Sequence, residues 1–159
     1  MHSANSFVEA ATEYCAWAES EPAAPETEAR VALRLLARLY ADALSLEPYG
    51  DINDELEGEN LSHENWKPFF SRFGALPFNY YGVVFDPQTI PPQEPVVGDL
   101  ADDLADIYRD LLEGLSLERA GHHGEAIHAW RQSFQNHWGA HAASGIRALH
   151  AWFEQETSW

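Results

Sequence analysis

The sequence predicts an all-α fold, a single-domain bundle of about five to six helices that also holds an irregular aromatic-rich segment and an acidic loop. Two observations support this prediction. Apolar residues recur at every third or fourth position in several segments, which places them on one face of a helix. Stretches containing glycine and proline separate these segments, and 45% apolar residues in a chain of 159 are enough for one core. We therefore expect a single helical domain over residues 1–159.

The first two helices are expected before residue 47. One covers residues 4–20 and the other begins near Glu26, and both show the helical repeat of apolar side chains. The repeating residues are Phe7, Ala11, Tyr14 and Ala18 in the first helix and Val31, Leu35, Leu39 and Ala43 in the second.

Three arginines form a basic ridge on the second helix. Arg30, Arg34 and Arg38 lie at positions i, i+4 and i+8 and therefore share one face. Such a ridge in an acidic chain is typical of ion pairs with a neighbouring acidic helix. The alternative is a contact surface for a protein partner, so the three arginines are candidate binding residues.

The middle of the chain combines a loop, a short helix and a connector. Residues 47–62 mix acidic side chains with proline, glycine and asparagine, which is typical of a mobile acidic loop. A short helix over residues 63–73 should follow and end at Gly74. Residues 86–95 are rich in proline and indicate an extended connector.

Aromatic side chains are concentrated in residues 66–85, which include Trp66, Tyr80 and Tyr81. A cluster of this kind usually packs into the core beneath a loop. The alternative is a partly exposed binding surface, because Trp and Tyr are frequent among the residues that dominate protein interfaces. These three residues are therefore further candidates for binding a protein partner.

Residues 98–141 indicate a helical hairpin that turns near Gly121. The first helix of the hairpin separates an apolar face from an acidic stripe. The apolar face carries Leu100, Leu104, Ile107, Leu111 and Leu115, and the acidic stripe carries Asp99, Asp102, Asp103, Asp106, Asp110 and Glu113. Repulsion within the stripe costs about a few tenths of a kcal/mol per pair, which the helix dipole offsets near the N-terminus.

Two histidines, His137 and His141, lie on the side of the second hairpin helix that should face the core. In an antiparallel hairpin, their nearest carboxylates should be those of Asp102, Asp103 and Asp106. Two imidazoles one turn apart, facing carboxylates, can bind a divalent metal in a helical bundle. The alternatives are a structural His–carboxylate contact in the core and a general-base pair. These five residues are candidate metal ligands, and no catalytic residue is assigned.

Composition limits the classes of partner. The net charge of −17 argues against binding to nucleic acid or to anionic lipid, both of which require clustered lysine and arginine. The single cysteine, Cys15, excludes an internal disulfide and favours a reducing compartment. No apolar run approaches the length of a membrane span. We therefore expect a cytoplasmic protein without a nucleic-acid or membrane partner.

Five segments of the chain resemble one family. They are FVEAATEYCAWAE near the N-terminus, LLARLYADAL, YYGVVFDP, GDLADDLADIYRDLLEGL and FQNHWGAHAASGIRALH. Together they extend over nearly the whole chain, which resembles the bacterial family known as domain of unknown function 5063. The resemblance implies a helical, cytosolic, bacterial protein and carries no assigned activity.

The sequence favours two functional hypotheses over a third, a nucleophilic hydrolase built on Cys15, because no histidine or basic residue lies at helical spacing from this cysteine to lower its pKa. The first is a non-enzymatic protein-interaction module that uses the aromatic segment, the arginine ridge or the acidic hairpin face. The second is a divalent-metal-binding protein or metal-dependent enzyme that uses the Asp/His cluster of the hairpin. No cofactor other than a divalent metal is expected, and the sequence leaves the partner and the oligomeric state open.

Overall fold

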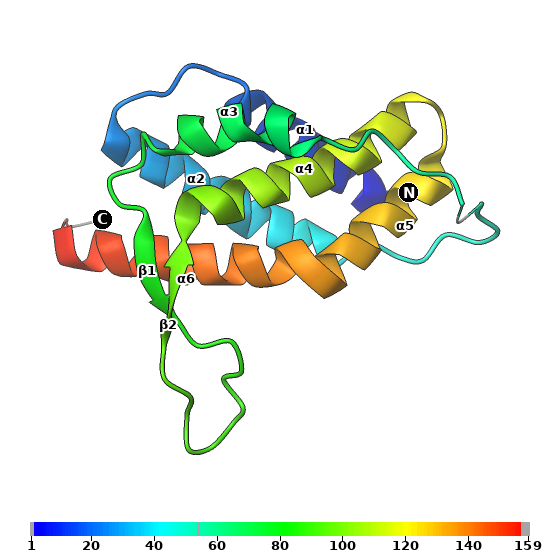
Figure 1. Cartoon of the computed structure of the whole chain (residues 1–159). Coiled ribbons are helices and arrows are strands. Elements are labelled where there is room, and N and C mark those ends of the chain that lie inside the picture. The colour runs from blue at the N-terminus through cyan, green and yellow to red at the C-terminus, as the bar shows by residue number, and fades with distance from the viewer. Residues whose placement is uncertain (1, 54, 157–159) are drawn as a thin grey trace.

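The computed structural model describes residues 2–53 and 55–156 and shows a mostly helical chain with a small sheet (Figure 1). The elements in chain order are α1 (His2–Ala18), α2 (Pro25–Ala43), α3 (His63–Phe73), β1 (Tyr80–Val83), β2 (Val96–Asp99), α4 (Leu100–Arg119), α5 (His123–Ser133), the π-helical turn η1 (Phe134–Trp138) and α6 (Gly139–Glu156). The predicted helical bundle is confirmed, but the prediction of an all-α fold is wrong because of the sheet. Asp54, in the predicted acidic loop, lies outside the described residues.

The sheet consists of β1 and β2, which pair antiparallel with Tyr81 opposite Gly98 and Gly82 opposite Val97. Valine and tyrosine favour extended backbone, but each strand has only four residues, too few to show an alternating pattern in the sequence. The predicted connector, residues 86–95, belongs to the loop between these strands. We call residues 80–99 the β-arm, whose loop extends away from the helices (Figure 1).

Helix α4 lies at the centre of the bundle and packs against α1, α3, α5 and α6 (Figure 1). The predicted apolar face of α4 is buried. Two hydrogen bonds from large aromatic side chains hold this face. The Tyr14 hydroxyl donates to the Leu104 carbonyl at 2.8 Å, and the Trp130 indole donates to the Leu111 carbonyl at 3.2 Å. Helix α4 begins where the Asp99 carboxylate accepts the backbone N–H of Asp102.

The arginine ridge of α2 faces α1. Arg34 and Arg38 form ion pairs with Glu13 of α1 at 2.7 Å and 2.8 Å, whereas Arg30 pairs with Glu26 of its own helix at 3.2 Å. These contacts agree with the ion-pairing interpretation. A role of the ridge in binding a partner stays a prediction.

The acidic loop, residues 47–62, contains no helix or strand in its described part and lies against the central hairpin. The backbone N–H of Glu59 donates to the Ser116 hydroxyl of α4 at 2.7 Å, and that of Asn53 donates to the Glu125 carboxylate of α5 at 3.0 Å. Helix α3 then runs from a cap at Ser62 to Gly74, as predicted.

The aromatic segment is divided between the core and the surface. Trp66 is buried, and Phe73 is fully buried beside Trp17 of α1. In contrast, Tyr80 and Phe85 of the β-arm are 71% and 79% exposed. The core interpretation therefore holds for the helical half of the segment, whereas much of the half in the β-arm is exposed. A role of this exposed part in binding a partner stays a prediction.

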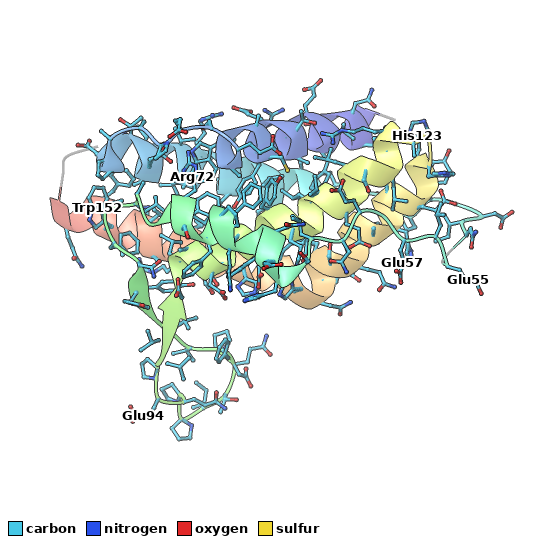
Figure 2. The ribbon with its side chains drawn as sticks, turned by 45° about the horizontal axis from the view of Figure 1, so that its top comes forward. Glu55, Glu57, Arg72, Glu94, His123 and Trp152 are labelled. Carbon is cyan, nitrogen blue, oxygen red and sulfur yellow. The ribbon has the colours of Figure 1, made fainter. Side chains whose placement is uncertain are left out.

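A buried ion pair connects α2 with α3. The Arg72 guanidinium lies 2.5 Å from the Glu28 carboxylate, which also accepts hydrogen bonds from the Trp17 indole at 3.0 Å and the Ala23 backbone N–H at 2.8 Å. Figure 2 shows Arg72 on the bundle, far from Glu94 in the loop of the β-arm. Burial opposes ionisation of Glu28, but these hydrogen bonds outweigh burial and lower the pKa of the carboxyl.

Replacing Glu28 with glutamine should lower the free energy of unfolding at pH 7 by about 3 kcal/mol, because Arg72 would remain buried without its anionic partner. Because folding lowers the pKa of Glu28, its ionic stabilisation is present above the ordinary value of 4.5 and is lost as pH falls through the folded-state pKa. The difference between the two proteins should therefore shrink in acid. Urea unfolding as a function of pH measures it.

The matched control is Glu26→Gln, which removes an exposed pair from the same helix and should change the unfolding free energy by less than about 1 kcal/mol. Equal losses in the two variants would contradict a special role for the buried pair.

Candidate metal centre

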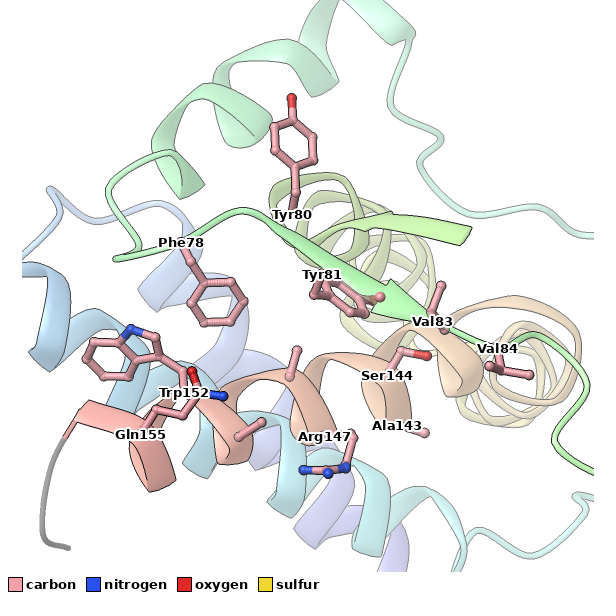
Figure 3. Close-up of a pocket in the computed structure, with 13 residues that line it drawn as sticks. Phe78, Tyr80, Tyr81, Val83, Val84, Ala143, Ser144, Arg147, Trp152 and Gln155 are labelled. Atoms are coloured by element: carbon pink, nitrogen blue, oxygen red, sulfur yellow. The ribbon is translucent and has the colours of Figure 1, made fainter. Parts of the chain in front are cut away.

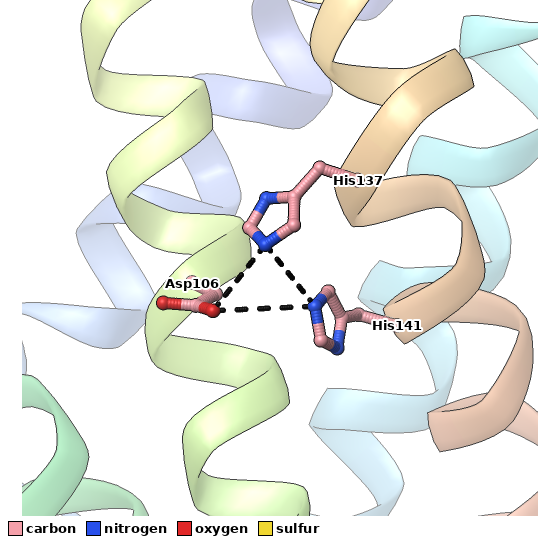
Figure 4. A group of neighbouring side chains, drawn as sticks. All are labelled: Asp106, His137 and His141. Atoms are coloured by element: carbon pink, nitrogen blue, oxygen red, sulfur yellow. Dashed lines mark hydrogen bonds and ion pairs between the residues drawn. The ribbon is translucent and has the colours of Figure 1, made fainter.

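Two histidines and three aspartates meet where α4 faces η1 and α6. The Nδ1 atom of His137 lies 2.6 Å from Asp110, and the Nδ1 atom of His141 lies 2.5 Å from Asp103. The two Nε2 atoms lie 3.3 Å apart. Asp106 Oδ2 completes a triangle with them, at 3.5 Å from His137 and 4.0 Å from His141 (Figure 4).

The hydrogen bonds of the two imidazoles determine where their protons lie. An ionised carboxylate only accepts, so each Nδ1 atom that faces an aspartate carries the hydrogen and donates it. In the neutral rings, both Nε2 atoms then present lone pairs. These lone pairs point toward each other and toward the carboxylate of Asp106, so three acceptors converge without a donor between them. A cation, either a proton on one imidazole or a metal ion, removes this conflict.

The local backbone explains how the histidines reach this position. The π-helical turn contains one residue more per turn than an α-helix, and the backbone N–H of Gly139 reaches back to the Phe134 carbonyl. A Cβ atom at Gly139 would lie only 2.4 Å from that carbonyl oxygen, so glycine permits the turn. As a result Trp138 becomes fully buried, and His137 rotates to the border of the core.

This rotation corrects the expectation that both histidines face the core. The side chain of His137 is 37% exposed and that of His141 is 25% exposed, whereas Asp106 is 14% exposed. The expectation from the sequence was based on an uninterrupted α-helix, and the π-helical turn changes the direction in which the side chains of this segment point. The ligand atoms therefore lie close to the surface instead of inside the core.

The structure brings together four of the five predicted metal ligands, Asp103, Asp106, His137 and His141. Asp102 lies beside them, and the pKa of its carboxyl is raised by burial and by the neighbouring carboxylates, Asp106 foremost. Sequence reasoning missed Asp110 as a partner of His137. The sequence does show Asp110 one turn after Asp106 in the same acidic stripe. However, it does not determine to within one turn how the two helices of the hairpin are aligned along their axes, so the sequence places the partner of His137 one turn away.

Tyr81 is a further residue of the site that the sequence did not assign to it. Its hydroxyl donates a short hydrogen bond to Asp103, the carboxylate that holds His141. Burial and this hydrogen bond raise the pKa of Tyr81. A separate hydrogen bond, between His141 and the same carboxylate, is the main reason why the pKa of His141 is raised. Tyr81, Asp103 and His141 thus form one chain of hydrogen bonds from the β-arm to α6.

Arg109 supplies positive charge to the other side of the site. Its guanidinium contacts Asp106 at 3.1 Å and Asp110 at 3.6 Å. The oxygen of Asp106 that binds Arg109 is Oδ1, which leaves Oδ2 directed at the two imidazoles.

The comparisons with known proteins concern the whole chain. The model of a family described as domain of unknown function (DUF5063) matches residues 1–155. The chain belongs to this family. The crystal structure of protein BF1032 from Bacteroides fragilis has a similar fold, with a TM-score of 0.77 and 21% sequence identity over 98% of this chain and 93% of that chain. No curated protein matches this chain significantly.

Two cavities in this DUF5063 protein meet at Tyr81. A cleft of about 420 Å³ lies between the β-arm and the segment from η1 to α6, and both histidines line it. A larger groove of about 680 Å³ runs along α6, between Phe78, Trp152 and the strand β1 (Figure 3). Tyr81 and Ser144 line both cavities. Of the two cavities, the cleft has histidine and aspartate side chains in its described lining, and the groove has none.

None of the described helices combines the length and the apolar character needed to cross a membrane. The expectation of a cytoplasmic location stays a prediction for this DUF5063 protein.

Gly98 allows Tyr81 to lie across the β-arm and reach Asp103. A Cβ atom at Gly98 would come within 2.6 Å of the Tyr81 ring, whereas one at Gly82 on the facing strand would meet no atom closer than 3.9 Å. Gly98→Ala should therefore displace the ring and lower the free energy of unfolding by about 1–3 kcal/mol, as overpacking does elsewhere. Urea unfolding measures this loss.

Gly82→Ala is the matched control, because it adds the same methyl group to the same two-stranded ribbon without this contact. It should leave the unfolding free energy within about 0.5 kcal/mol of the original. If both alanine variants lose equal stability, the proposed packing of Tyr81 on Gly98 is wrong.

Proposed function

We propose that this protein binds one divalent transition-metal ion through the Nε2 atoms of His137 and His141 and the carboxylate of Asp106. The observation that supports the proposal is the convergence of three acceptor atoms, all within 4.8 Å of one another, while each Nδ1 atom is held by a separate aspartate. A metal ion accepts lone pairs from all three atoms at once. A single proton satisfies fewer of them.

The size of the triangle supports the same proposal. Zinc bonds to nitrogen and oxygen are about 2.0–2.1 Å long, so neighbouring ligand atoms in a tetrahedral site are about 3.4 Å apart. The separations here are 3.3, 3.5 and 4.0 Å. A small rotation of His141 would bring the third separation into this range.

The surroundings resemble those of known metal sites in kind. Histidine ligands usually donate their second ring N–H to a carboxylate, which fixes the ring and its tautomer. Asp110 and Asp103 would do this for His137 and His141. Two histidines and one carboxylate suit Zn²⁺ and also Fe²⁺, and three protein ligands leave at least one position for water or another molecule.

The competing interpretation is a structural cluster in which one imidazole is protonated and no metal binds. A partly exposed imidazolium between carboxylates would also join the hairpin to α6 by charge. The two interpretations differ in what happens when metal is added, so direct titration separates them.

Titration of protein without a histidine tag should detect one bound ion per chain with Zn²⁺ or Co²⁺, measured by calorimetry and by elemental analysis. Asp106→Asn and His137→Gln should each weaken binding by about 100-fold or more, because each removes a ligand. Asp110→Asn should weaken binding by about 10–100-fold, because it releases the ring of His137. His128→Gln is the matched control on α5 and should bind as the original protein does.

Urea unfolding of each variant shows whether it is folded under the titration conditions. Failure of the original protein to bind any of the tested ions would refute the metal centre. Equal affinity of His128→Gln and His137→Gln would place the ion elsewhere.

A second candidate function is the binding of a protein partner through the β-arm. Among the described residues, seven large apolar side chains are exposed, and five of them lie in the β-arm: Tyr80, Phe85, Ile90, Val96 and Val97. A concentration of exposed apolar side chains in one segment is typical of interaction surfaces. Tyr80 is also one of the candidate binding residues from the sequence.

If the β-arm binds a partner, Phe85→Asp and Ile90→Asp should each reduce the amount of partner protein captured from the native host by more than about tenfold. Leu44→Asp is the control, because Leu44 is 67% exposed on another part of the surface. Quantitative mass spectrometry of captured proteins measures the loss. Equal capture by all three variants contradicts this candidate function.

A further inference from the structure

We infer that the cleft beside the metal centre binds an uncharged, apolar small molecule that offers the metal one neutral donor atom. This inference rests on the proposed metal site and adds the chemical class of its ligand. Three properties of the cleft support it: its apolar wall, the sign of its charges and its size.

The apolar wall comes from the β-arm. Val83, Val84, Phe85 and Val97 line one side of the cleft, and Ala140 lines the helical side next to the histidines. Phe85 and Val97 are 79% and 76% exposed, so a ligand that covers them would remove a large apolar area from water. An apolar group of the ligand therefore has a surface to contact within reach of the metal position.

The charged residues of the cleft are all acidic. Asp99, Asp102 and Asp103 line it, and its described lining contains no lysine or arginine. The nearby guanidinium of Arg109 is directed at Asp106 and Asp110. The metal ion and Arg109 together would supply three positive charges, against five carboxylates if Asp106 and Asp110 are counted with these three. The surroundings of a carboxylate or phosphate group would therefore remain net negative, which disfavours anionic ligands.

Cationic ligands are disfavoured for a different reason. A protonated amine has no lone pair to give to a metal, so it cannot be the donor atom whatever the charge around it. Neutral donors such as an azole nitrogen, an alcohol or a carbonyl oxygen have a lone pair and carry no negative charge. The cleft volume of about 420 Å³ is in the range of small-molecule sites.

The experiment uses the full chain loaded with Co²⁺, whose visible spectrum reports a new ligand on the metal. The probes are imidazole, phenylimidazole and the analogue of phenylimidazole that carries a carboxylate in the para position. Phenylimidazole should bind at least about tenfold more tightly than imidazole, because its ring contacts the apolar wall, and about tenfold more tightly than the carboxylated analogue.

Two variants of the same strand test the wall. Val97→Asp places a charge in the cleft and should weaken phenylimidazole binding by about tenfold, measured with Co²⁺ at saturation. Val96→Asp makes the same chemical change on the neighbouring residue, which does not line the cleft and points to the other face of the strand. It should bind phenylimidazole as the original protein does.

The inference is overturned if the carboxylated analogue binds as tightly as phenylimidazole, or if both aspartate variants weaken binding equally, while Co²⁺ still binds. Absence of Co²⁺ binding by the original protein overturns the metal site as well. The Co²⁺ titration performed before each probe therefore separates failure of the ligand class from failure of the proposed function.

Discussion

The structure depends on how the acidic stripe of α4 is neutralised. The opposite face of α4 is buried in the core, so the helix cannot rotate to carry its carboxylates further into water. Each of the inner carboxylates instead receives a donor from another element: Asp103 from Tyr81 and His141, and Asp110 from His137. These contacts connect the β-arm, η1 and α6 to one helix, and they bring the two imidazoles together.

The π-helical turn allows the histidines to contact these aspartates while the core stays close-packed. One additional residue in the turn lets Trp138 fill the core while His137 stays within reach of Asp110 and Asp106. π-Helical turns of this kind are rare in proteins overall, but those that occur are often found at functional sites.

The net charge of the whole chain and the local geometry of the site both favour binding of a cation. A net charge of −17 raises the local concentration of cations and repels anions, which favours occupation of a cation site and disfavours anionic ligands near it. The β-arm adds an exposed apolar surface next to the carboxylates. Membership of DUF5063 and the similar fold of the Bacteroides fragilis protein establish the architecture in which these features occur.

The sequence by itself determined the helices, because helical periodicity and caps are local properties that a single chain displays. It also indicated that His137 and His141 would meet carboxylates of α4, since both lie in one hairpin of short sequence separation. Only the tertiary structure decided the pairing of β1 with β2, the π-helical rotation and the approach of Tyr81 to Asp103. The strand pairing and the Tyr81–Asp103 contact depend on packing between segments that are distant in sequence, and the π-helical rotation depends on a one-residue change of helical phase. None of these three features leaves a periodic signal in the chain.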